Sequence, residues 1–260
     1  MVSIQSKGVG VIVFLALALT VIFYLTKDVR MNSLDTADTD TNGEQKSEQD
    51  NKIDKGYSIE VLPIESKKSV PIPDLDRRVN FETADKNSIL AIEEISRKLK
   101  IEKNNLSLWI DLGSWRKAIL DYEGARLAFE YVVSVSPNYI VPLVNLGDLY
   151  QFYLHDNEKA EENFKRAIKS NPSFVDSYYR LSELYRLSYK QDTNLASETL
   201  KQGLQANPGN LTLLLQLGGY YAEKKDVINA KMYYTKALEQ AKKDKNEGAV
   251  KEIEAVLSSL

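Results

Sequence analysis

Apolar residues recur at helical spacing through the C-terminal part of the chain, and they come in pairs of segments. In the first pair, Trp109 and Leu112 lie three residues apart, which is the spacing of one face of an α-helix. A second stripe holds Ala125 and Phe129, and Pro137 closes it because proline has no backbone N–H with which to continue a helix. The pattern predicts two amphipathic helices joined by a short turn.

The same order of residues occurs three more times. The Leu-Gly pair at 112–113 recurs at 146–147 and 217–218, with Leu-Ser at 181–182, so the successive offsets are 34, 35 and 36 residues. A set of residues that keeps its order at nearly fixed spacing indicates an internal repeat. Glycine costs about 1 kcal/mol of helix propensity relative to alanine, so its recurrence indicates close helix packing. The repeated positions expected to build the core are Trp109, Leu112, Gly113, Ala125, Phe129, Pro137, Leu146, Gly147, Tyr150, Ala160, Phe164, Ala167, Pro172, Leu181, Tyr185, Ala196, Pro208, Leu217, Gly218, Tyr221, Ala230, Tyr234 and Ala237.

These residues resemble the tetratricopeptide repeat (TPR) family over residues 106–244, and the first copy is the closest match. The resemblance implies an all-α fold: a right-handed α-solenoid of about four helix-turn-helix repeats, each of which buries its apolar face against a neighbour. The copies differ, because the second turn has one extra residue, the third has two, and Ser182 replaces glycine. The family binds many unrelated partners, so the resemblance does not identify one.

Amphipathic helices are also predicted at both ends of the repeats. At the C-terminal end, Val250, Ile253 and Leu257 form an apolar stripe opposite charged residues, as a helix that caps a solenoid requires. At the N-terminal end, Ile92 and Ile95 mark a similar helix. We interpret the N-terminal helix as a cap or a half-repeat.

A membrane anchor is predicted near the N-terminus. Residues 8–26, GVGVIVFLALALTVIFYLT, carry no charge over 19 residues, and such a helix spans about 28 Å, close to a hydrocarbon core. Lys7 and Lys27 flank it, and Tyr24 suits the interface. A cleaved signal peptide is the alternative, but the stretch is long and no clear small-x-small cleavage site follows it. We predict a single-pass protein with its repeat domain on the extracytoplasmic side, although flanking charges barely discriminate the orientation and a cytoplasmic repeat domain is the alternative.

Two further segments separate the anchor from the repeats. Residues 31–55 contain seven acidic and three basic residues and too little apolar surface to offset the entropy of ordering, so we expect a disordered linker. Pro63, Pro71 and Pro73 prevent a regular helix in residues 57–85. We call residues 57–85 the strap; it is either an ordered segment along the repeat surface or an internal ligand in the concave groove. The predicted organisation is an N-terminal tail (1–7), a transmembrane helix (8–26), an acidic disordered linker (27–56), the strap (57–85), an N-terminal capping helix (86–104), repeats at 106–139, 140–174, 175–210 and 211–244, and a C-terminal capping helix (245–260).

Composition bears mainly on what the chain does not do. The formal net charge is −3 and there is no Lys/Arg-rich block, so a nucleic-acid footprint is absent. With no cysteine, the chain has no disulfide, thiolate metal site or cysteine nucleophile. The one histidine, His155, stands in a predicted turn, and a single imidazole makes a poor metal site. We therefore expect no enzymatic activity, no metal site and no cofactor.

The resemblance implies a binding surface on the concave side, where the first helices of successive TPR repeats lie. In relatives that bind extended peptides, the residue equivalent to Asn145 bonds the ligand backbone, and an amide can donate and accept at once. Arg180 at the next equivalent position could hold a carboxylate. Some relatives bind the tail of a chaperone through lysine and asparagine residues, where this chain has Ile110, Ser114 and Asp176. This difference argues against a chaperone tail as the ligand. The candidate partner-binding residues are Ile110, Ser114, Val144, Asn145, Asp148, Tyr179, Arg180, Glu183, Leu215 and Gln216.

These features predict a membrane-anchored TPR adaptor that binds a protein or extended peptide on its concave face and recruits or organises it at the membrane. A self-associating structural scaffold of the cell envelope, and hence a homo-oligomer, is the alternative. An accessory subunit of a membrane enzyme or secretion complex is a less favoured one.

Overall fold

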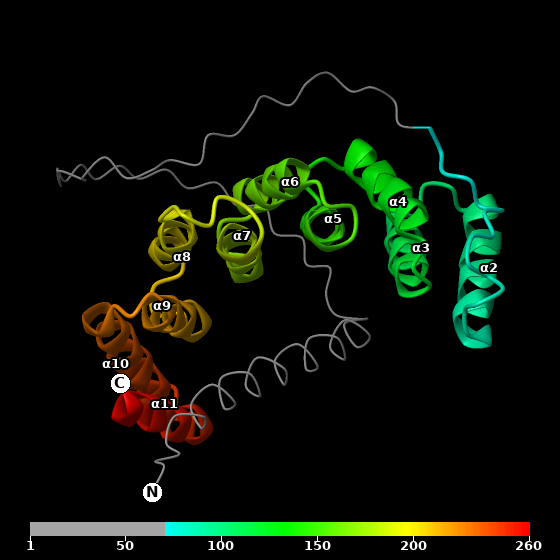
Figure 1. Ribbon diagram of the computed structural model, residues 1–260. Helices are drawn as coiled ribbons and strands as arrows, with labels where there is room; N and C mark the ends of the chain where they lie inside the picture. The colour runs from blue at the N-terminus through cyan, green and yellow to red at the C-terminus, as the bar shows by residue number, and fades with distance from the viewer. Residues whose placement is uncertain (1–70) are drawn as a thin grey trace, which may run out of the picture. The chain divides into compact units, whose positions relative to one another are not determined.

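A computed structural model of the chain describes residues 71–260 (Figure 1). The predicted tail, transmembrane helix, linker and strap residues 57–70 lie outside the described residues. Within the described part there are ten helices and no strand, and none of these helices is long and apolar enough to cross a membrane. The helices are α2 (Lys86–Ile101), α3 (Leu106–Ala118), α4 (Tyr122–Val135), α5 (Ile140–Phe152), α6 (Asn157–Ser170), α7 (Val175–Leu187), α8 (Leu195–Ala206), α9 (Leu211–Glu223), α10 (Val227–Lys243) and α11 (Glu247–Ser259).

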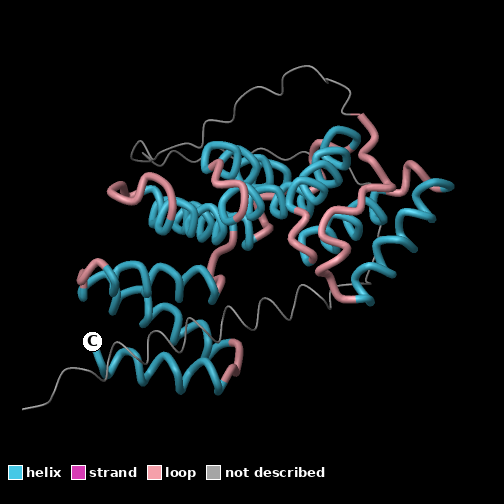
Figure 2. Tube along the Cα trace, turned by 45° about the vertical axis from the view of Figure 1, so that its right-hand side comes forward, coloured by secondary structure: helices cyan, strands magenta, loops and turns pink. Residues whose placement is uncertain are grey.

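The helices form an all-helical solenoid of four consecutive pairs, α3–α4, α5–α6, α7–α8 and α9–α10, with α2 before them and α11 after them. Each helix packs against the next one along the chain, and the first helices also contact one another, α5 with α7 and α7 with α9. These first helices lie on the inner side of the curved row, and the second helices lie on the outer side (Figure 1). The view in Figure 2 shows loops joining successive helices throughout the described part. We call the inner-side face of α3, α5, α7 and α9 the inner surface.

The repeated glycines make room for an aromatic ring of the same repeat. A Cβ placed on Gly113 would lie less than 3.0 Å from the ring of Phe129, and a Cβ on Gly147 would be similarly crowded. In the fourth repeat, Gly218 faces Tyr234 in the same way. The glycine therefore costs helix propensity but allows the ring of the second helix to lie directly against the backbone of the first.

Most of the repeated positions are buried, but Tyr221 and Tyr234 of the fourth repeat are only partly buried. Trp109, Ala125 and Phe164 have no exposed surface. The prolines at 172 and 208 stand in exposed loops after their helices, where they limit the helix without entering the core.

The turn between the two helices of each repeat has one recurring backbone feature. Leu120, His155, Lys190 and Lys225 all adopt positive φ, between 54° and 62°, and successive ones are 35 residues apart (120, 155, 190, 225). None of them is glycine, although this left-handed conformation favours glycine. The exposed His155 thus has a conformational role in its turn.

The N-terminal end of the row is covered by α2 and by the described part of the strap. Leu75, Phe81 and Ala84 pack against the apolar cluster that α2 shares with α3 and α4, in which Ile92 and Leu99 are buried. Helix α2 begins after its N-cap Asp85, whose carboxylate accepts from the backbone N–H of the third helical residue. At the other end of the row, α11 packs on α10.

Candidate protein-binding surface

The inner surface carries one apolar and one polar position in each first helix. The apolar positions are Ile110, Val144, Tyr179 and Leu215. The polar position is the next residue in each helix, namely Asp111, Asn145, Arg180 and Gln216. The four polar residues are all partly exposed, and of the four apolar residues only Val144 is buried.

An ion pair joins this surface across two repeats. The Nη1 atom of Arg180 on α7 lies 3.0 Å from the Oδ2 atom of Asp148 on α5, and the Arg180 Nε atom lies 3.4 Å from Asp176. The guanidinium therefore stabilises the stacking of α5 and α7. A ligand carboxylate would have to compete with both aspartates for Arg180, which weakens its predicted role as an open anion-binding residue.

A second ion-pair group follows on α7 and α9. Arg186 pairs with Glu183 at 2.8 Å within α7 and with Glu223 of α9 at 2.9 Å. The carboxylate of Glu183, which we predicted as a partner-binding residue, is thus engaged within the protein.

Two of the predicted contact residues lie deeper than expected. Val144 and Asp148 each have only 8% of their surface exposed. The prediction that their side chains lie open on the inner surface is wrong, because the contact of α5 with α7 covers this face of α5. The other candidates are at least partly exposed, and they are Ile110, Ser114, Asn145, Tyr179, Arg180, Glu183, Leu215 and Gln216.

Asp111 belongs to the inner surface and was missed in the sequence-based list. It occupies the same place in α3 as Asn145 in α5 and Arg180 in α7. The residue is partly exposed, and burial raises the pKa of its carboxyl above the ordinary aspartate value. Aligning the copies at the residue after Ile110 would have identified it.

A buried charge cluster lies at the N-terminal end of the row. Arg116 on α3 and Asp121 in the α3–α4 turn form an ion pair at 2.9 Å, and each side chain is only 1% exposed. Arg77 of the strap donates two hydrogen bonds to the same carboxylate, from Nε to Oδ2 at 2.8 Å and from Nη2 to Oδ1 at 2.8 Å. Arg116 also donates to the backbone carbonyl oxygens of Arg77, at 3.2 Å, and Asp74, at 3.4 Å.

The electrostatics of this cluster favour ionised Asp121. Burial by itself raises the pKa of the Asp121 carboxyl, but hydrogen bonds from Arg77, from the Gly124 backbone N–H and from Arg116 outweigh burial, so the pKa lies below the ordinary value. For Arg116, burial dominates and lowers the pKa of the guanidinium, which still remains charged because an arginine starts from a very high value. The cluster is therefore a structural attachment between the strap and the first repeat.

Arg116 stands where the later repeats have tyrosine. Each of Tyr150, Tyr185 and Tyr221 follows the repeated leucine by four residues, as Arg116 does. This departure from the repeat pattern is the feature of the sequence that marks the position of the cluster.

The described residues of the strap contact the end of the repeat row. Besides the Arg77 contacts, Arg78 pairs with Glu93 and Lys100 pairs with Asp76, both on the α2 side. The Asn80 side chain donates to the backbone carbonyl of Ile119 in the α3–α4 turn, at 3.0 Å. Within residues 71–85, these polar contacts join the strap to α2, to the end of α3 and to the turn after it.

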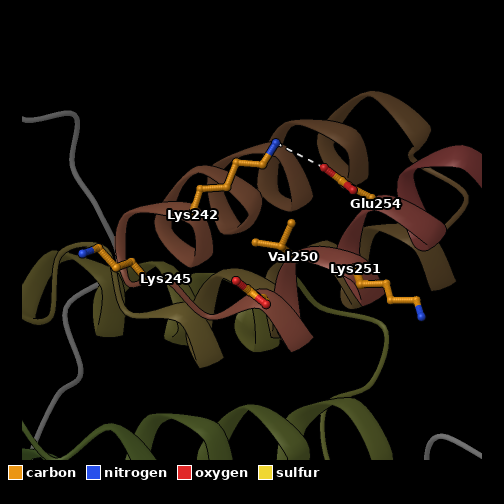
Figure 3. A pocket seen from close by; sticks show the side chains of 6 residues that line it. Lys242, Lys245, Val250, Lys251 and Glu254 are labelled. Atoms are coloured by element: carbon orange, nitrogen blue, oxygen red, sulfur yellow. Dashed lines mark ion pairs between the residues drawn. The ribbon is translucent and has the colours of Figure 1, made fainter.

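The C-terminal helices enclose a shallow pocket of different character. Three lysines and two glutamates surround Val250 there, and Lys242 pairs with Glu254 at 3.2 Å (Figure 3). Its charged side chains are thus of both signs. In the described residues, no group of three or more His, Cys, Asp or Glu side chains is placed to hold a metal ion.

Comparisons with known proteins agree with this architecture. A family model for the tetratricopeptide repeat matches residues 142–174 and 211–244. Tetratricopeptide repeat protein 8 of Mus musculus is 33% identical over 97 residues, which cover 37% of this chain and 18% of that protein. Tetratricopeptide repeat protein 6 of Homo sapiens is 27% identical over 141 residues, which cover 51% of this chain and 26% of that protein. The chain thus spans about a quarter or less of the length of these relatives.

Among solved structures, a crystal structure of MamA protein superposes with a TM-score of 0.50 at 24% identity, covering 62% of this chain and 86% of that one. At this identity the likeness concerns the fold alone. The repeated positions, the paired helices and these matches agree that the described part of the chain is an all-helical solenoid, in which residues 142–174 and 211–244 match the tetratricopeptide repeat.

Proposed function

We propose that this chain is an adaptor that binds an extended segment of a partner protein along its inner surface, without catalysing a reaction. We propose further that residues 8–26 anchor it in a membrane, with the repeats on the extracytoplasmic side, so that the partner is recruited or organised there. The observation that carries the binding proposal is the recurrence on the first helices of a polar position that is partly exposed in every repeat, beside an apolar position that is partly exposed in every repeat except the second.

The chemistry of these positions suits an extended segment. Tyr179 and Leu215 are partly exposed and offer apolar contact at intervals of one repeat. Asn145 and Gln216 each carry an amide that can both donate to and accept from a peptide backbone. A partner held by backbone contacts and apolar side chains does not need a carboxylate that binds Arg180.

Photocrosslinking in cells tests the proposal. A photoreactive amino acid replaces Tyr179 in the full-length chain, and crosslinked products are identified by mass spectrometry. The matched control carries the same amino acid in place of Ile228, which is 84% exposed but lies on α10, a second helix. We expect a reproducible foreign protein from position 179 and not from position 228. Absence of any foreign protein from position 179 would contradict the adaptor proposal.

Self-association as an envelope scaffold is the second candidate, and one observation favours it. Val227, Ile228 and Met232 on α10 are exposed apolar residues, and Ile228 and Met232 are four apart, on one face of the helix. The same experiment separates the two candidates, since a scaffold predicts crosslinks between copies of this chain from position 228 and no foreign protein from position 179.

A further inference from the structure

The arginines of the inner surface are paired, whereas a carboxylate near its N-terminal end is not paired with any described residue. Arg180 is bound by Asp148 and Asp176, and Arg186 is bound by two glutamates. Asp111 on α3 forms no ion pair and no side-chain hydrogen bond with any residue that the structure describes. Among residues 71–260 it is therefore a carboxylate without a counter-charge, while Arg180 and Arg186 are each bound by two carboxylates.

The position of Asp111 in the row explains why it has no counter-charge. Arg180 occupies the same place in α7 and reaches back to Asp148 on the preceding first helix. Asp111 is on α3, the earliest first helix among the described residues, and the helix before it, α2, packs against α3 at the end of the row. A residue at this place in α3 has no preceding first helix to pair with in the part of the chain that the structure describes.

Partial burial makes the unpaired carboxylate more than an ordinary surface charge. Burial raises the pKa of Asp111, which means that its negative charge is incompletely solvated. A cationic group that docks against it replaces lost hydration and gains a charge-assisted hydrogen bond. An anionic segment is disfavoured by the same charge.

We propose that Asp111 recognises a lysine or arginine side chain of the bound partner segment, and that this basic residue is positioned at the first repeat while apolar residues of the segment lie along the row from Ile110 to Leu215. This inference rests on the proposed function, since it specifies the partner as a basic and apolar extended segment. Asp111 would attract a basic residue of the partner. Arg180 and Arg186 are already paired with carboxylates of the protein, so they offer little attraction to an acidic segment.

Peptide selection on the full-length protein tests the inference. A random decapeptide library displayed on phage is panned against the wild-type chain, against Asp111→Asn, and against the control Asp192→Asn, which removes an exposed carboxylate from the α7–α8 turn. We expect wild type and control to enrich peptides with a lysine or arginine at one fixed distance from apolar residues. The Asp111→Asn protein should keep the apolar preference and lose the basic one, and the affinity of a selected peptide should fall about tenfold or more.

The outcomes separate this inference from the proposed function. Enriched peptides without a basic residue, or a basic preference that survives Asp111→Asn, would overturn the inference and leave peptide binding intact. Failure of the wild-type chain to enrich any peptide, together with no foreign crosslink from position 179, would overturn both. Charge reversal by Asp111→Lys gives a second readout, because it should shift the preference toward aspartate and glutamate, and unchanged thermal unfolding would show that the variants fold.

Discussion

The residue four positions after the repeated leucine has different partners at the N-terminal end of the repeat row and in its interior. In the interior, the hydroxyl of Tyr150 donates to Glu130 at 2.6 Å, and that of Tyr185 donates to Glu161 at 2.5 Å. In both cases the acceptor lies on the second helix of the preceding repeat. In the first repeat the equivalent residue is Arg116, and its acceptors are Asp121 and two backbone carbonyls of the strap.

The difference shows how the row ends. A tyrosine has one hydroxyl and suits a single glutamate on a regular helix, whereas an arginine has five donors that can reach several backbone groups of an irregular segment. The arginine brings a charge that must be neutralised when it is buried, and Asp121 supplies the counter-charge. The strap thus supplies, beside α2, the polar partners that a preceding repeat supplies in the interior.

Removal of the counter-charge should have the largest effect. We expect Asp121→Asn to lower the free energy of unfolding by about 3 kcal/mol, because Arg116 would remain buried without its anion. Asparagine can still cap α4, so the change isolates the charge. The measurement is urea denaturation followed by tryptophan fluorescence, since the only two tryptophans, Trp109 and Trp115, both lie on α3.

The control for this change is Asp156→Asn at the start of α6. Asp156 is also an N-cap, but its ion pair with Lys159 is exposed, and such pairs contribute about 0–1 kcal/mol. Equal losses in the two variants would mean that the N-terminal end has no special electrostatic attachment.

Replacement of the repeated glycine should reduce the free energy of unfolding by the same amount in the first repeat and in the second. Gly113→Ala and Gly147→Ala should each lose about 1–3 kcal/mol, because the added methyl group meets the aromatic ring that faces each glycine. Gly219→Ala is the control, since its nearest neighbour is the Tyr234 hydroxyl at 3.7 Å, and it should gain up to about 1 kcal/mol from helix propensity. Thermal unfolding of the three variants checks this, and a harmless Gly113→Ala would show that the first repeat packs differently from the second.

The hydrogen bond between Tyr150 and Glu130 should contribute less to the free energy of unfolding than the Arg116–Asp121 cluster does. We expect Tyr150→Phe to lose about 1 kcal/mol, because one hydrogen bond is removed while Glu130 keeps its ion pair with Arg126. Tyr220→Phe should be near neutral, since the Tyr220 hydroxyl makes no hydrogen bond to the described residues. Urea titrations of both variants decide this, and a loss as large as that of Asp121→Asn would remove the contrast between the two regions.

Acid should weaken the N-terminal attachment. Because the folded protein holds the pKa of Asp121 below its ordinary value, the carboxylate stabilises the fold fully above the ordinary aspartate pKa. This contribution is lost as the pH falls through the lowered pKa. The difference in unfolding free energy between wild type and Asp121→Asn should therefore shrink in acid, and a difference that is constant with pH would contradict the assignment.

The repeated architecture could be predicted because each copy repeats the same packing problem. The stripe of Trp109 and Leu112 and the glycine after it predict paired helices without reference to distant residues. The attachment of the strap could not be predicted from these local patterns, because Arg77 and Asp121 are 44 residues apart.

The candidate site was predicted less completely than the fold. The place of a residue within its repeat predicts which face of the helix it occupies. It does not predict the burial of Val144 and Asp148, which depends on how closely α5 and α7 approach each other. The pairing of Arg180 likewise depends on a neighbouring repeat. The membrane anchor and its orientation remain predictions from the sequence.

The most direct test of the account is to restore the repeat pattern at the first repeat with Arg116→Tyr. Substitution toward a repeat consensus usually stabilises a protein. If the strap supplies the polar partners that a preceding repeat supplies in the interior, this tyrosine has no glutamate to bind and two strap carbonyls lose their donor. We predict that the free energy of unfolding, measured by urea and tryptophan fluorescence, falls by about 2–4 kcal/mol. An unchanged or increased free energy of unfolding would contradict the account.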